Sequence, residues 1–255
     1  MRTERRGGLG VWTLDRPQAK NALDAATFAD LERAVGEAST DTTLRAVILT
    51  ADGDTFAAGG DLRELRGATT PADAERLAEA GRRVCDGLAA LEVPVLAALP
   101  GAAIGGGAEL AMACDLRIAA PGASLCFKHA HMGVTTAWGI LPRLLSIAGR
   151  GATSRALLTG QTLDAAACLQ LGLVDAVSEA APGACLGLAE AWARDIERGA
   201  PLAVAGMKAL LRGALASEGL RALERAHFVA SWVSADHKEA VESFFERRAP
   251  RWTRS

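Results

Sequence analysis

The sequence predicts an α/β protein with parallel strands and one main core, on two observations. Short apolar runs alternate with amphipathic helical segments as far as about residue 153, and this alternation is typical of parallel pairing. Half of the 255 residues are hydrophobic, which suffices to bury a substantial core without disulfides or metals.

The fold is expected to open with a strand and then a helix. Leu9 to Leu14 forms an apolar run of strand length. Asp24 can cap a helix whose apolar face is Phe28, Leu31 and Val35, at spacings of three and four residues.

The middle of the chain repeats this alternation. Arg45 to Thr50 is a β-branched, apolar run typical of a strand that is buried on both faces, and residues 51–54 break it. Ala72 to Leu91 has apolar residues at helical spacing, with charges on the opposite face. Three further segments are expected to be a strand, a helix and a strand: Pro94 to Leu99, Glu109 to Ala113, and Asp115 to Ala119.

The C-terminal part is expected to be mainly helical. After about Thr153 only Leu173 to Val177 resembles a strand, and alanine-rich helical segments fill the rest. There is neither a repeat at a fixed period nor a low-complexity linker. We therefore predict an α/β core over residues 1–195 and a helical region over 196–255.

The composition argues against several partners and locations. Because 28 basic residues face 30 acidic ones, no strong field attracts nucleic acid or an anionic membrane. No uncharged apolar run reaches the roughly 18 residues that span a bilayer. The N-terminus lacks the apolar run of a secretory signal, which indicates a cytoplasmic protein. The five cysteines show no CxxC pairing and are expected to be buried thiols.

The segment from Gly101 to Leu110 is the most informative, because three successive glycines lie between a strand and a helix. It is not a P-loop, since no Lys-Ser or Lys-Thr follows Gly107, and Leu110 stands where a dinucleotide fingerprint needs glycine. The helix N-terminus and the permissive glycine backbone favour a developing anion. Tight packing of helix on strand is the alternative explanation.

A second glycine loop favours the anion site. Residues 56–62 (FAAGGDL) also follow a buried strand, so their N–H groups should emerge at the same edge of a parallel sheet. Two main-chain donors from separate loops could then converge on one oxygen.

These two loops resemble those of the crotonase family, also called the enoyl-CoA hydratase/isomerase family. Three further segments resemble family motifs in the same order: residues 15–23 (DRPQAKNAL), residues 158–160 with 172–174 (LTG and GLV), and residues 244–250 (FFERRAP).

The resemblance implies a spiral of repeated ββα turns followed by a helical region that packs homotrimers, often paired into hexamers. It implies an acyl-CoA substrate, no metal, and no cofactor beyond the coenzyme A of the substrate. The two oxyanion-hole donors carry over to the main-chain N–H groups of Ala58 and Gly106.

The expected acid and base are Glu109 and His129. Glu109 matches the first of the two glutamates that hydratases of this family use, and it lies almost one helical turn after Gly106. Aligning Gly133 with the family's glycine places His129 where the second glutamate belongs. Histidine can still transfer protons. His129 and His131 are expected to share the face of a strand.

Hydration of a 2-enoyl-CoA is the default reaction of such a protein, but the missing glutamate leaves others open. Phe127, His129, residues 132–133 and residues 138–139 look more like the alkylmalonyl-CoA decarboxylases of the family, whose reaction needs no base to form the enolate. Against this, Gly60 stands where one decarboxylase branch carries a histidine. An isomerase, a thioester hydrolase and a non-catalytic acyl-CoA binder also remain. No GxSxG elbow of a serine hydrolase is present.

The resemblance also suggests where the coenzyme A binds. The family holds the nucleotide near its first motif, so Arg16 and Lys20 are the candidates here. Residues 67–73 are expected to border the acyl pocket. Asp61 is expected to order its loop by capping the next helix.

Overall fold

The computed structural model describes residues 1–213, 225–226, 228–230 and 232–248. Nine helices are described: α1 (Ala25–Thr40), α2 (Leu62–Leu65), α3 (Pro71–Ala90), α4 (Gly106–Ala113), α5 (Leu141–Thr159), α6 (Ala165–Gln170), α7 (Ala184–Glu197), α8 (Pro201–Gly213) and α10 (Ala235–Glu246). Two short 3-10 helices are η1 (Pro17–Ala19) and η2 (Ala130–Met132).

The strands form two sheets. The larger sheet has the order β1 (Arg2–Arg6), β2 (Leu9–Leu14), β3 (Ala46–Ala51), β5 (Val95–Leu99), β7 (Leu116–Ala119) and β10 (Ala176–Val177). The smaller has the order β4 (Thr55–Ala57), β6 (Ala102–Ile104), β8 (Ser124–Cys126) and β9 (Thr162–Asp164). All pairings are parallel except β1 with β2 and β8 with β9.

Successive turns of the chain build both sheets at once. Each turn gives one strand to the larger sheet and the next to the smaller, as in β3–β4, β5–β6 and β7–β8, and then enters a helix. This is the predicted spiral of ββα turns, and the α/β class is confirmed. The residue pattern revealed none of the strands of the smaller sheet, β4, β6, β8 and β9, whose three residues each are too few to show an alternation.

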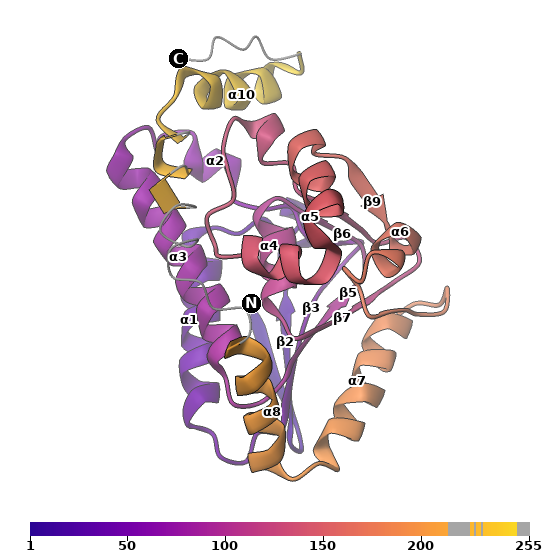
Figure 1. Ribbon diagram of the computed structural model, residues 1–255. Helices are drawn as coiled ribbons and strands as arrows, with labels where there is room; N and C mark the ends of the chain where they lie inside the picture. The colour runs from indigo at the N-terminus through magenta and orange to yellow at the C-terminus, as the bar shows by residue number, and fades with distance from the viewer. Residues whose placement is uncertain (214–224, 227, 231, 249–255) are drawn as a thin grey trace.

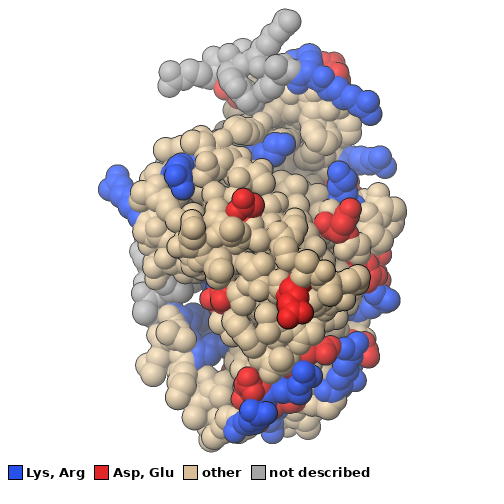
Figure 2. All heavy atoms as spheres, turned by 90° about the vertical axis from the view of Figure 1, so that its right-hand side faces the viewer, with Lys and Arg blue, Asp and Glu red and all other residues tan. Residues whose placement is uncertain are grey.

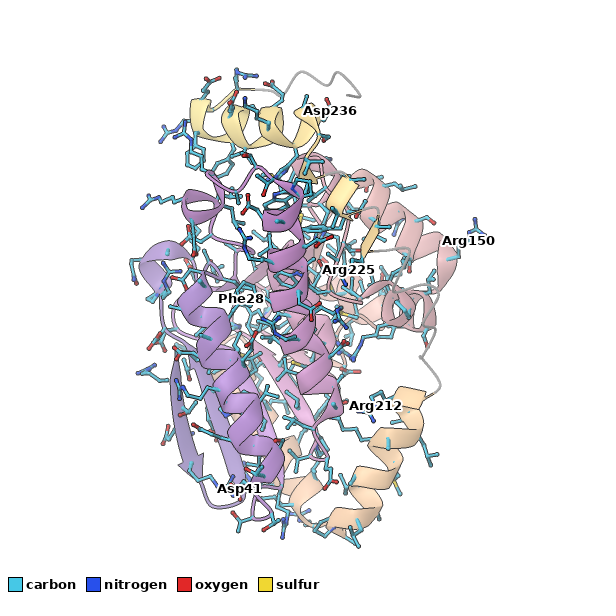
Figure 3. The ribbon with its side chains drawn as sticks, turned by 90° about the vertical axis from the view of Figure 1, so that its left-hand side faces the viewer. Phe28, Asp41, Arg150, Arg212, Arg225 and Asp236 are labelled. Carbon is cyan, nitrogen blue, oxygen red and sulfur yellow. The ribbon has the colours of Figure 1, made fainter. Side chains whose placement is uncertain are left out.

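Helices cover both faces of the larger sheet (Figure 1). Along β3, Val47 and Leu49 face the helices α1 and α3, whereas Ile48 faces α7. Figure 3 shows α1 and α3 side by side over their face of the sheet. All six residues of β3 are buried, and the strand is covered on both faces, as the run from Arg45 to Thr50 predicted.

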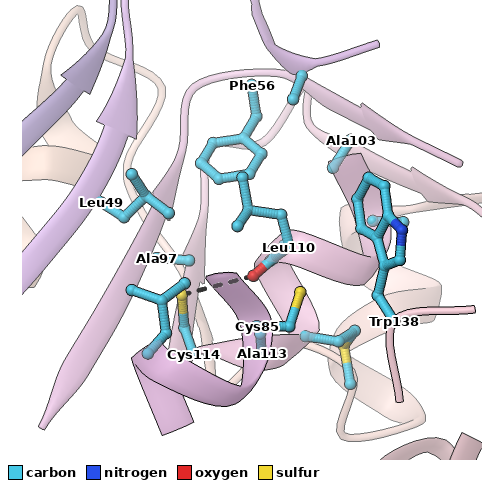
Figure 4. Close-up of a cluster of buried hydrophobic side chains, with 14 of the residues drawn as sticks. Leu49, Phe56, Cys85, Ala97, Ala103, Leu110, Ala113, Cys114 and Trp138 are labelled. Carbon is cyan, nitrogen blue, oxygen red and sulfur yellow. Dashed lines mark hydrogen bonds between the residues drawn. The ribbon is translucent and has the colours of Figure 1, made fainter. Parts of the chain in front are cut away.

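The larger core cluster surrounds α4 (Figure 4). Helix α4 is buried over almost its whole length, and Cys114 Sγ lies 3.6 Å from the carbonyl oxygen of Leu110. All five cysteines are free and buried, which confirms their predicted state. This burial fixes the helix whose N-terminus carries the three successive glycines 105–107.

The surface carries both signs of charge, as the balanced composition predicted. Figure 2 shows acidic and basic side chains interspersed around a broad uncharged area on the face of α5 to α7. Within the described part of the chain, no helix is both long and apolar enough to cross a membrane.

Helix α7 ends at Glu197, two residues beyond the predicted core boundary, and it packs on the larger sheet. Helix α8 is joined to the core through Lys208, which donates to the carbonyl oxygens of Leu88 and Val93. The C-terminal motif at residues 244–250 runs past the described residues at 248. The division into a core and a trimer-packing region stays a prediction.

Candidate active site

The two glycine loops meet in space, as their positions after parallel strands predicted. Strands β4 and β6 are parallel neighbours, and each runs into its glycine loop. Gly59 has φ of 92°, and a Cβ added there would lie 3.0 Å from the carbonyl oxygen of Ile104 and 3.3 Å from the nitrogen of Gly106. Only glycine fits such a conformation and such a close approach without strain. Two main chains are therefore held in direct contact.

The amide of Ala58 is not a free donor in this arrangement. Its N–H donates to the carbonyl oxygen of Lys20 at 3.0 Å. This bond ties the loop to the segment after η1, and it contradicts the prediction that Ala58 supplies an oxyanion-hole donor.

Gly60 offers the free amide instead. Its neighbours are held by Leu23, which donates its N–H to Gly59 O at 2.8 Å and accepts from the Asp61 N–H at 3.1 Å. Among the described residues, nothing accepts a hydrogen bond from the N–H of Gly60 or from that of Gly106. Along this loop the amides of Ala58 and Asp61 are bonded and that of Gly60 is free. The acceptors are Lys20 and Leu23, which lie far away in the sequence and could not be identified from the loop's own residues.

Gly106 is the first residue of α4, and its cap residue Gly105 has φ of 54° and no side chain to occupy the helix N–H groups. The first N–H groups of a helix have no partner within the helix, and the helix dipole places positive charge there. An anionic oxygen at this point would be favoured electrostatically.

Glu109 lies on the same helix, 3% exposed. Its Oε1 lies 2.9 Å from Nε2 of His129, and its Oε2 accepts the main-chain N–H of Trp138 at 3.0 Å. The structure therefore brings the two predicted catalytic side chains together. Both carboxylate oxygens have a protein partner.

His129 presents its other ring nitrogen differently. Nδ1 is buried and has no hydrogen-bond partner. If the carboxylate of Glu109 is ionised, Nε2 carries the proton that it shares with Oε1, and Nδ1 of the neutral ring holds a lone pair. The pair thus leaves Nδ1 of His129 as a buried polar atom without a hydrogen-bond partner.

The segment that carries His129 is a turn rather than a strand. His129 precedes the 3-10 helix η2, and Gly133 closes the turn with φ of 67°. The prediction that His129 and His131 share a strand face is therefore wrong: His131 is exposed and lies against Gly160. Within the part of the chain that is described, no three His, Cys, Asp or Glu side chains are grouped to hold a metal ion.

Trp138 is a site residue that sequence reasoning did not assign. Besides the main-chain bond to Glu109, its indole packs so closely on two glycines that a Cβ on Gly81 or Gly106 would lie 2.0 Å or 2.3 Å from ring atoms. Its ring also meets Phe28 edge to face, with centroids 5.5 Å apart. The sequence had singled out residues 138–139 only as part of the resemblance to the decarboxylases, without a role for the indole.

The two candidates for coenzyme A binding differ in their surroundings. Arg16 forms ion pairs with Asp24 at 3.0 Å and Asp61 at 3.2 Å, and it donates to Ala22 O at 2.7 Å. Its guanidinium therefore joins the first motif to the loop that carries Gly59, Gly60 and Asp61. Lys20 is exposed and has left-handed backbone, with φ of 51°. Asp61 caps α2 by accepting from the Arg63 N–H, as predicted.

Comparison with known proteins identifies the family. The family model described as enoyl-CoA hydratase/isomerase matches residues 4–255. The chain belongs to the enoyl-CoA hydratase/isomerase family. This confirms the resemblance that the glycine loops indicated.

Named relatives of this family cover nearly the whole chain. A short-chain-enoyl-CoA hydratase of Clostridium acetobutylicum is 35% identical, over 96% of this chain and 94% of its own. A probable enoyl-CoA hydratase of Mycobacterium tuberculosis is 36% identical, over 98% and 96%. The crystal structure of an enoyl-CoA hydratase/isomerase from Pseudoalteromonas atlantica superposes with a TM-score of 0.87, at 29% identity and 99% coverage of both chains.

Proposed function

We propose that this enzyme hydrates a 2-enoyl-CoA. The observation that carries the proposal is the contact of the Gly59–Gly60 loop with Gly106, on the helix whose Glu109 pairs with His129. The N–H groups of Gly60 and Gly106 have no acceptor among the described residues. The hydratase names of the two curated relatives support it.

The thioester carbonyl would sit on the two amides. When water adds to the β-carbon, negative charge moves onto this carbonyl oxygen, and prepositioned donors stabilise the enolate more than the ground state. Losing one such donor costs about 2.7–4 kcal/mol in comparable sites. The dipole of α4 would act in the same direction.

His129 would handle the protons, with Glu109 as its positioning residue. Nδ1 of the neutral ring takes a proton from the attacking water, and the hydroxyl adds to the β-carbon. The imidazolium that forms is stabilised by the carboxylate at Nε2, and it then returns a proton to the α-carbon. Water is consumed, and the protein ends in its starting state. This assignment rests on Glu109 having both oxygens bonded and His129 having Nδ1 unbonded.

Decarboxylation of a malonyl-type thioester is the second candidate. One observation favours it: the described site pairs one carboxylate with a histidine, and that carboxylate is already doubly hydrogen-bonded. Loss of carbon dioxide itself generates the enolate, so only protonation of the α-carbon remains, and His129 could supply that proton.

We further propose that Lys20 contacts the coenzyme A phosphates and that Arg16 orders the loop beside them. Lys20 is exposed next to the oxyanion loop, since its carbonyl oxygen holds Ala58. We also propose that the chain assembles into trimers through its C-terminal helices. Helix α8 exposes four large apolar side chains, which favours burial against another chain: Leu202, Met207, Leu210 and Leu211.

The test is mass spectrometry of CoA thioesters after incubation with the enzyme. The panel holds crotonyl-CoA, a 3-enoyl-CoA, and methyl- and ethylmalonyl-CoA. Gain of water on crotonyl-CoA supports the hydratase. Loss of carbon dioxide from a malonyl thioester, with crotonyl-CoA unchanged, replaces it with the second candidate. If no thioester changes in mass, both proposals fail, and an isomerase, whose reaction leaves the mass unchanged, or a non-catalytic acyl-CoA binder remains.

A further inference from the structure

The indole of Trp138 forms a wall along the reacting part of the candidate site. Its main-chain nitrogen holds Glu109 at one end, and its ring lies against Gly106 at the other. The proposed oxyanion donor and the proposed acid–base pair are therefore bridged by a single residue. Any acyl group whose carbonyl sits on Gly106 and whose reacting carbons face Glu109 and His129 lies beside this ring.

On its other side, the ring packs against described residues of α1 and α3. Gly81 on α3 touches the indole so closely that a Cβ there would lie 2.0 Å from Cε2, and Phe28 on α1 packs edge to face. Trp138 is only 6% exposed and belongs to the main core cluster, at whose edge Figure 4 shows it. The room between the site and helices α1 and α3 is therefore occupied by this one side chain.

We propose that Trp138 sets the length limit of the acyl group, so that the site takes short, compact acyl chains and excludes extended ones. The proposal rests on the function proposed above, because that function supplies the carbonyl position. Glycine at positions 81 and 106 leaves room for the indole of Trp138. A smaller residue at position 138 would leave an open channel from the site toward α3. Interiors are close-packed, so a longer chain could enter only by displacing the ring.

The experiment uses a series of 2-enoyl-CoA substrates, from crotonyl-CoA through hexenoyl-CoA to octenoyl-CoA. The wild-type protein should prefer crotonyl-CoA in kcat/KM. Trp138→Ala should lower the ratio of kcat/KM for crotonyl-CoA to kcat/KM for octenoyl-CoA by about tenfold or more. This is the scale on which hydrophobic pockets discriminate single methylene groups. Trp138→Phe keeps a smaller ring and should give an intermediate ratio, which preserves the test if the alanine variant folds poorly.

A refilled variant is the matched control. The Cβ direction of Gly81 points into the indole, so Trp138→Ala with Gly81→Val returns apolar volume from the opposite wall. This double variant should restore the preference for crotonyl-CoA. If Trp138→Ala acted by loosening the fold in general, the single variant and the double variant would both lack a preference for crotonyl-CoA over octenoyl-CoA.

Binding of saturated thioesters separates this inference from the proposed reaction. Calorimetry with butyryl-CoA and octanoyl-CoA needs no turnover, and the same order of preference should appear in Kd. If the wild-type protein turns over or binds the long chain as well as the short one, or if a folded Trp138→Ala leaves the ratio unchanged, the inference is wrong. If chain-length selectivity follows Trp138 while crotonyl-CoA gains no water, the inference stands and the hydratase proposal fails.

Discussion

Glu109 and His129 form one hydrogen-bonded unit, with Oε1 and Nε2 2.9 Å apart and the carboxylate 3% exposed. A buried carboxylate that also accepts from the Trp138 N–H has little freedom to act alone. We therefore assign the proton transfers to the histidine, and the orientation of its ring to the glutamate.

This assignment predicts non-additive loss of activity. Glu109→Gln and His129→Gln should each lower kcat by about 100- to 10,000-fold, the usual contribution of acid–base catalysis. Because the two residues act as a unit, the double variant should be little worse than either single one. Steady-state kinetics on the substrate found by mass spectrometry measures this. Independent losses that multiply in the double variant would show that each residue has its own role.

The proposed oxyanion-hole donor at Gly60 can be removed while the hydrogen bonds of its neighbours Gly59 and Asp61 are kept. Gly60→Pro removes the N–H, whereas Leu23 continues to hold Gly59 and Asp61. We expect kcat to fall about 100- to 1,000-fold. Gly60→Ala is the matched control, because it adds a Cβ that meets the same Leu65 side chain but keeps the N–H. Equal activity of the two variants would exclude this amide as a donor.

The sequence predicted correctly those parts of the site that depend on local geometry. It failed where hydrogen bonds or packing between distant segments determine the conformation. Glu109 follows Gly106 by nearly one helical turn, so their common direction is set by local geometry. Ala58 was assigned wrongly because its amide is taken by Lys20, a partner 38 residues earlier that no local pattern indicates. The turn around His129 was likewise expected as a strand, although Gly133 with φ of 67° packs against α10 far along the chain.

The ion pair of the buried Lys208 with the half-buried Asp115 predicts a loss of stability when the lysine is truncated. Nζ lies 2.7 Å from Oδ2 of Asp115 and donates to Leu88 O and Val93 O, and the lysine side chain is 6% exposed. Lys208→Met removes the donor to the two carbonyl oxygens and the cation beside Asp115, which keeps its bond from the Val95 N–H. The free energy of unfolding should therefore fall by about 1–3 kcal/mol. Denaturant titration measures it, with Lys238→Met on the exposed side of α10 as the control. A loss no larger than the control's would show that α8 contributes little to the fold.

The cysteines should be inert in the native protein. Burial raises the pKa of Cys85 well above its usual range, that of Cys114 to about 12 and that of Cys168 to about 11. Because the thiolate is the reactive form, alkylation at pH 8 should modify none of the five native thiols and all five after denaturation. Mass spectrometry counts the adducts. Rapid native labelling of Cys114 would mean that the core around α4 opens readily.

His237 predicts how stability depends on pH. Its imidazole donates from Nδ1 to Met132 O at 2.7 Å and is 7% exposed, and burial lowers its pKa below the ordinary value of 6.5, although the bond to Met132 opposes the shift. The unfolded chain therefore takes up this proton at a higher pH than the folded protein. Stability should accordingly be complete above about pH 6.5 and fall as the pH drops below it, by up to about 1.4 kcal/mol per pH unit for one proton.

Replacing His237 isolates this contribution from those of the other titrating groups. His237→Gln can still donate to Met132 O but binds no proton, so its free energy of unfolding should fall less steeply than that of the wild type between pH 7 and 5. The comparison uses denaturant titrations at several pH values, with Lys238→Gln on the same helix as the control. Parallel curves for wild type and His237→Gln would contradict the prediction. A steeper fall in the wild type would show that acid weakens the contact of α10 with the turn that carries His129, because charging His237 requires its solvation.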